Sequence, residues 1–280
     1  MTPRRLLLTG GAAVAGILLI LVFTLLLIPS RELEGAVTRF FAREGYTFHA
    51  ARFSKAFPLG ITVRGASVAG ERGELLRFDR ARARIALFPL LTGRVAVIFD
   101  AAAGSGRITG EYDLRKGTGG HIEARGMRLE DIPFFRSVAG AEAKGLLSLD
   151  LALKGSGPAT TGELKLEVKG ADLRGVKIGE TPLPDAGYDT VRGLIRLGGR
   201  QATLESFTLQ GAELYIRLKG NFPLTSPIGS APLNLTLELM PKPEFLNRQQ
   251  LVFALLTKYL VTPGHYQLPI RGTLAKPLLQ

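Results

Sequence analysis

Cysteine is absent from this chain of 280 residues, and so is tryptophan. Without cysteine the chain has no disulfide, no thiolate ligand for a metal and no lipoprotein attachment point. Histidine occurs only at His49, His121 and His265, which do not show the two-residue or four-residue spacing of metal ligands. We therefore expect neither a metal nor a cofactor, and we interpret each histidine as a surface or strand residue.

Sequence patterns typical of catalytic sites are also lacking. No Gly-x-Ser-x-Gly segment is present. Gly104, Gly106 and Gly110 fit neither the dinucleotide nor the triphosphate loop pattern, so they predict a turn between strands. Glu130 and Asp131 are adjacent acids, but their position suits a solvated turn at least as well as a carboxylate pair. We expect that the chain is not an enzyme.

A long charge-free run lies near the start of the chain, at residues 6–28. A helix of roughly 20 apolar residues crosses a bilayer, and no small-residue cleavage step follows, so a retained anchor is favoured over a cleaved secretory signal. Arg4 and Arg5 precede the run and favour a cytoplasmic amino end. The sequence thus predicts a cytoplasmic tail at 1–5, a transmembrane anchor at 6–28 and an exported remainder. In a bacterium this is a single-pass inner-membrane protein with most of its chain in the periplasm.

The formal net charge is +12, which suggests anionic partners. Basic and acidic residues alternate along the segments, however, and no helix-turn-helix or RNA-binding signature is present, so we expect no nucleic-acid partner. Anionic lipid headgroups are favoured over nucleic acid as the electrostatic partner, and a plain solvated face without a partner is favoured over both.

A short amphipathic helix is expected at residues 30–44, directly after the anchor. Ser30 can cap it, and Glu32 and Glu34 suit its first turn. An apolar stripe at helical spacing predicts that this helix packs under the domain instead of forming a bare stalk. The stripe consists of Leu33, Val37, Phe40 and Phe41.

From residue 46 onward, apolar and polar residues alternate with a period of two in segments bounded by glycine, which indicates strands with one apolar and one polar face. Short turns favour antiparallel neighbours, and strands do not alternate with helices, which argues against a doubly wound α/β fold. The fold class predicted for 46–280 is a mainly β domain with a curved, largely antiparallel sheet and a few short helices. The residues predicted on its apolar face are Leu147, Leu149, Leu151, Leu153, Leu164, Leu166, Val168, Leu214, Ile216, Leu218, Leu233, Leu235 and Leu237.

Two interpretations of this apolar face stay open. A two-sheet sandwich would bury it as a closed core, whereas a partly open curled sheet would leave a groove suited to acyl chains. Two segments depart from the strand pattern. Residues 132–138 predict a short helical or irregular plug, and residues 243–261 predict an amphipathic helix that closes one end of the sheet. A membrane-surface or partner-binding role is the alternative for this second helix.

Three segments resemble known proteins. After the anchor and short helix, Phe-Pro-Leu-Gly-Ile-Thr-Val at 57–63 and Ile-Ala-Leu-Phe-Pro-Leu-Leu-Thr-Gly-Arg at 85–94 resemble the amino-terminal part of AsmA-like periplasmic proteins. The tail at 268–277 is similar to the closing strand of that group. Within it, the short length, the strand from Gly145 to Gly155 and the compact end resemble the type II secretion system protein N (GspN) family.

This resemblance covers essentially the whole chain and implies two functions. The first is an inner-membrane accessory of the type II secretion system, the machine that exports folded proteins across the outer membrane, with other secretion-system proteins as partners. The second is an AsmA-like lipid-binding or lipid-transfer protein whose partners are acyl chains held on the apolar sheet face. The resemblance carries over no catalytic residues.

Overall fold

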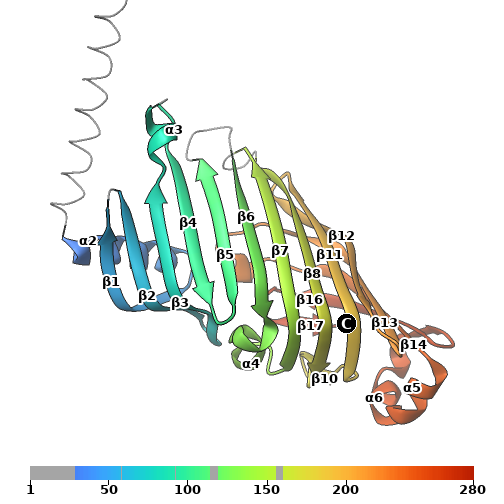
Figure 1. Ribbon diagram of the computed structural model, residues 1–280. Coiled ribbons are helices and arrows are strands. Elements are labelled where there is room, and N and C mark those ends of the chain that lie inside the picture. The colour runs from blue at the N-terminus through green and yellow to red at the C-terminus, as the bar shows by residue number, and fades with distance from the viewer. Residues whose placement is uncertain (1–28, 58, 92, 114–118, 156–159) are drawn as a thin grey trace, which may run out of the picture.

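The computed structural model describes residues 29–280, apart from 58, 92, 114–118 and 156–159. The chain forms one large antiparallel sheet with a few short helices (Figure 1), so the prediction of a mainly β fold is confirmed. The predicted tail at 1–5, with Arg4 and Arg5, and the predicted anchor at 6–28 lie outside the described residues. Within the described part, no helix is long and apolar enough to span a bilayer.

Neighbours in sequence are almost always neighbours in the sheet. The first strands are β1 (Thr47–Ala56), β2 (Gly60–Gly70), β3 (Gly73–Ile85), β4 (Ala96–Ala103), β5 (Gly106–Asp113), β6 (Gly119–Arg128), β7 (Glu142–Lys154) and β8 (Thr161–Arg174). A separate ribbon of β9 (Lys177–Ile178) and β10 (Thr181–Pro182) follows. The sheet continues through β11 (Ala186–Gly198), β12 (Gln201–Gln210), β13 (Leu214–Pro223), β14 (Asn234–Pro241), β16 (His265–Gly272) and β15 (Leu260–Thr262), and β17 (Pro277–Leu279) pairs with β16.

Glycine makes the sharp reversals between strands possible. Gly104 adopts a φ of +54° in the turn between β4 and β5, a conformation that costs other residues steric strain. The backbone N–H of Gly104 donates a hydrogen bond of 2.9 Å to the Asp79 carboxylate, which fixes the turn to β3. Gly106 and Gly110, which the sequence grouped with Gly104, lie in strand β5.

Helix α2 (Ser30–Arg43) packs on the first strands through part of its apolar stripe. Val37 and Phe41 contact a small core that includes Val63, and the rings of Phe41 and Phe48 stack at 5.3 Å. Phe40 lies off this contact and is exposed. The helix begins at Ser30 without a side-chain cap, because Pro29 occupies the capping position.

The segment at 243–261 forms three short helical pieces instead of one helix, and its last two residues belong to β15. The pieces are α5 (Pro243–Arg248), α6 (Gln250–Leu255) and the 3-10 turn η4 (Thr257–Tyr259). The break falls at Gln249, whose backbone leaves the helical region and whose side-chain amide donates a 2.7 Å hydrogen bond to the carbonyl of Asp185. The remaining helical pieces are α3 (Leu87–Leu91), η1 (Leu129–Asp131), α4 (Phe134–Ser137) and η3 (Ile228–Ser230).

The sheet curls so that its last strands pass behind its middle strands (Figure 1). Side chains from both parts form one core, in which Val168 of β8 belongs to the same cluster as Leu268 of β16. The loop between β13 and η3 also contacts the segment after α2, because the Ser226 hydroxyl donates a 2.8 Å hydrogen bond to the Glu44 carboxylate.

Candidate binding face of the curved sheet

One apolar face runs across the sheet as a continuous row of paired side chains. Leu149 of β7 pairs with Leu166 of β8, which pairs with Gly193 of β11. The space above Gly193 is filled by the side chains of Leu166 and Phe207, because a Cβ at Gly193 would lie only 2.8 Å from atoms of both. The row then continues through Phe207, Leu218, Leu237 and Leu268.

The residues predicted for the apolar face converge on this same side of the sheet. Leu147 pairs with Val168, and Leu151 pairs with Leu164. These two pairs lie two residues along the strands on either side of the Leu149–Leu166 pair, on the same face. Leu214, Ile216 and Leu218 lie in β13, Leu235 and Leu237 lie in β14, and Leu233 directly precedes β14. Leu153 lies at the far end of β7, opposite Gly162.

Burial divides this face into a closed part and an open part. At the closed part, Leu239 and Leu268 are completely buried and Leu214 is 1% exposed. Along β7 and β8 the predicted leucines are only half-buried; these are Leu147, Leu149, Leu151, Leu153, Leu164 and Leu166. The face is thus a packed core beneath the C-terminal strands and a partly exposed apolar band on the middle strands.

The apolar band extends onto strands for which the sequence pattern gave no site residue. Phe99 of β4 and Ile122 of β6 both pair with Gly110 of β5, from opposite sides, and both are half-buried. Ile122 also pairs with Leu151, so β4 to β6 continue the band. The sequence signal that could have found these residues is the alternation of Phe99 with Asp100 and of Ile122 with Glu123. This alternation extends over fewer residues than the leucine repeats and is therefore a weaker signal.

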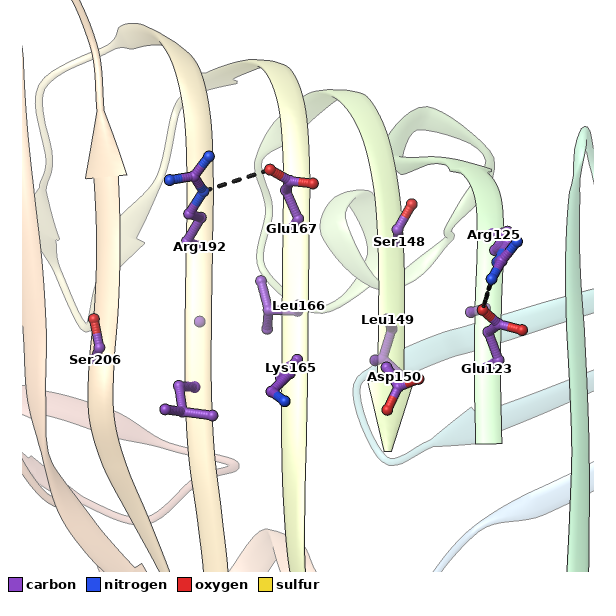
Figure 2. A pocket seen from close by; sticks show the side chains of 13 residues that line it. Glu123, Arg125, Ser148, Leu149, Asp150, Lys165, Leu166, Glu167, Arg192 and Ser206 are labelled. Carbon is purple, nitrogen blue, oxygen red and sulfur yellow. Dashed lines mark hydrogen bonds and ion pairs between the residues drawn. The ribbon is translucent and has the colours of Figure 1, made fainter. Parts of the chain in front are cut away.

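The opposite face of the middle strands carries charge. A shallow trough of about 610 Å³ lies across β6, β7, β8, β11 and β12 (Figure 2), and most of its lining residues are polar. Its charges are largely paired within the face, since Arg192 meets Glu167 at 3.4 Å and Arg125 bonds to Glu123. Ser148 also lines the trough, but no basic side chain is hydrogen-bonded to it that could activate its hydroxyl.

Glu130 and Asp131, the adjacent acids, hold turns in place. The pKa of Glu130 is lowered by hydrogen bonds from its own backbone N–H and then from Arg128, whose Nη2 lies 2.7 Å from the carboxylate. The same carboxylate accepts a 3.3 Å bond from the N–H of Gly145 in β7. Asp131 accepts a 3.4 Å bond from the N–H of Ser105. Each acid therefore joins neighbouring backbone segments.

The histidines are not gathered into a site. His49 lies in β1, His121 in β6 and His265 in β16. His121 is exposed and its Nε2 lies 3.5 Å from the Asp150 carboxylate. Over the described ranges, no group of three or more histidine, aspartate and glutamate side chains is placed to hold a metal ion.

Comparisons with protein-family models, with curated proteins and with solved structures found no match for this chain. The geometry defines a β protein built on one large curled sheet, with an apolar band that continues into a closed core.

Proposed function

We propose that this chain is an inner-membrane-anchored periplasmic accessory component of a type II secretion system, and that it acts by binding other proteins of that system. The support from sequence is the resemblance to the protein N family within the AsmA-like group. Two of the resembling segments lie at neighbouring strand ends, because 57–63 includes the turn between β1 and β2, and 85–94 includes α3.

A surface suited to protein binding is the observation that carries this proposal. Leu251 and Leu255 of α6 are 85% and 60% exposed, and Leu260 and Val261, which follow shortly after in β15, are exposed as well. We name these four residues the cap patch. An apolar cluster of this kind on a soluble domain is typical of a protein interface, because water otherwise penalises each exposed side chain.

The test is a double substitution in the cap patch, Leu251→Glu with Leu255→Glu, in cells that depend on the chain for secretion. We expect the exported enzymes to accumulate in the periplasm, whereas the matched control Leu274→Glu, at another exposed leucine, secretes normally. A photoreactive residue at 251 should crosslink to a secretion-system protein. Normal secretion by the double variant at normal protein levels would contradict the proposal.

A second candidate function is AsmA-like lipid binding, in which an acyl chain lies along the partly exposed apolar band. The half-buried leucines of β7 and β8 favour it, because an acyl chain covering them would gain about 0.8 kcal/mol for each buried methylene. The band adjoins the closed core, so the packed side chains of the core would limit how far a bound acyl chain extends along the sheet.

Neighbouring residues on opposite faces of β7 provide the test for lipid binding. A photoreactive residue at Leu151, on the apolar band, should form lipid adducts in native membranes, whereas the same residue at Ala152 should not. Equal adducts at both positions, or none at Leu151, would remove the lipid function and leave the secretion proposal intact.

A further inference from the structure

Five arginines crowd the polar face of β1, β2 and β3. Arg52 pairs with Arg64, and Arg64 pairs with Arg80, so three guanidinium groups stand side by side across three strands. Arg82 and Arg84 follow on the same face of β3, since side chains alternate along a strand. Like charges placed directly opposite each other destabilise a sheet. We name these five residues the arginine cluster.

No acidic side chain in the described part of the chain neutralises the arginine cluster: none of the five forms an ion pair there. Asp100 pairs with Arg82 in the register, but its carboxylate is bonded to Arg107. The Nε of Arg82 is buried without a hydrogen-bond partner. The cluster therefore presents net positive charge, unlike the paired charges of the trough on the middle strands.

Two exposed phenylalanines stand at the end of the same strands. Phe57, in the turn after β1, is 76% exposed, and Phe88, in α3 after β3, is 85% exposed. Figure 1 shows α3 projecting beyond the ends of β3 and β4. Aromatic side chains at such a tip, next to uncompensated arginines, are the combination that inserts at the boundary between headgroups and acyl chains.

We propose that this corner of the sheet docks on the anionic phospholipid headgroups of a bilayer, with Phe57 and Phe88 at the acyl boundary. A strand rises about 3.3 Å per residue, so Arg80 lies about 13 Å further from the tip than Arg84. A headgroup layer is roughly 5 to 8 Å thick, so Arg84 and Arg82 reach it when the phenylalanines insert. The rest of the cluster then lies within about a Debye length of the charged surface.

A lipid surface fits this corner better than an acidic protein. Guanidinium groups match phosphate geometry, and the phenylalanines flank the charges at the strand ends, where a bilayer reaches them together with Arg84. The inference rests on the proposed anchor at 6–28, which would hold α2 and the adjoining first strands near the membrane. It depends neither on secretion nor on acyl-chain binding along the apolar band.

The absence of tryptophan makes the docking directly measurable. The full chain with Phe88→Trp is placed in nanodiscs of phosphatidylcholine alone or with one quarter phosphatidylglycerol. We expect the indole emission to shift to shorter wavelength, and to be quenched by doxyl-labelled lipid, only in the anionic nanodiscs. High salt should reverse both effects.

Two controls isolate the arginine cluster. Adding Arg82→Gln and Arg84→Gln should abolish the quenching, whereas Arg192→Gln and Arg217→Gln, on more distant strands, should leave it unchanged. Leu255→Trp in the cap patch should stay unquenched. A Phe88→Trp indole that remains in water on anionic nanodiscs overturns the proposal and points to an acidic protein for this corner; quenching that is insensitive to phosphatidylglycerol and to salt overturns it as well.

Discussion

A matched pair of leucines on one row of the sheet can separate the closed core from the open band. Leu149 and Leu268 lie in the same cross-strand row, but Leu268 is completely buried and Leu149 is only half-buried. Leu268→Ala should leave a cavity and cost about 2–5 kcal/mol of unfolding free energy. Leu149→Ala removes a side chain that still touches water, and since full burial of leucine is worth roughly 1.5–3 kcal/mol, the loss should be ~1 kcal/mol.

The assay is urea unfolding of the full chain in a mild detergent, followed by far-ultraviolet circular dichroism because the chain lacks tryptophan. The shift in the urea midpoint, at constant slope, gives the difference in unfolding free energy for each variant. Equal losses at the two positions would refute the reasoning, because the row would then be covered along its whole length. A larger loss at Leu149 would show that the packed part of the face has been placed at the wrong end.

Three further outcomes follow from single groups. Glu238 is a buried acid bonded to Lys219, whose own side chain is 47% exposed, so Lys219→Met should cost about 1–3 kcal/mol, and adding Glu238→Gln should recover much of this in the same urea assay. Burial raises the pKa of Tyr188, so the native state holds the phenolic proton more tightly than the unfolded chain does. The part of the unfolding free energy that depends on this proton is complete below about pH 10 and is lost as the pH rises further. Tyr188→Phe should remove that part of the loss of stability at high pH. A loss at high pH as large as that of the unsubstituted chain would contradict the expectation. Gly220→Ala should destabilise the chain more than Gly199→Ala, because both positions have positive φ but only a Cβ at Gly220 overlaps the backbone of β14. Similar melting temperatures would count against this placement of β13.

The strands were predictable from sequence because their signal is local. The leucines from Leu147 to Leu153 alternate with Ser148, Asp150 and Ala152, and β7 forms over the segment that this alternation predicts. The break in the C-terminal helix was not predictable. The apolar spacing continues past Gln249, and the bond that competes with the helix comes from Asp185, 64 residues away.

In the candidate sites, too, the features set by local sequence were predictable and those set by distant contacts were not. Alternation assigned the leucines to one face, but it carries no information on which of them are covered. The covering strands come from distant parts of the chain, since Val168 of β8 and Leu268 of β16 belong to one core. The arginine cluster shows the same limit. Arg80, Arg82 and Arg84 are visible in the sequence, yet their crowding by Arg64 depends on the register of β2 against β3.

The strand order gives the sheet a modular character. Because nearly every strand hydrogen-bonds to its neighbour in sequence, each hairpin can pair as soon as its two strands are available, without waiting for distant segments. A hairpin added or removed between β4 and β8 would lengthen or shorten the apolar band while leaving the other pairings intact. The reach of the band could therefore change during evolution by whole hairpins, at little cost to the packed C-terminal end.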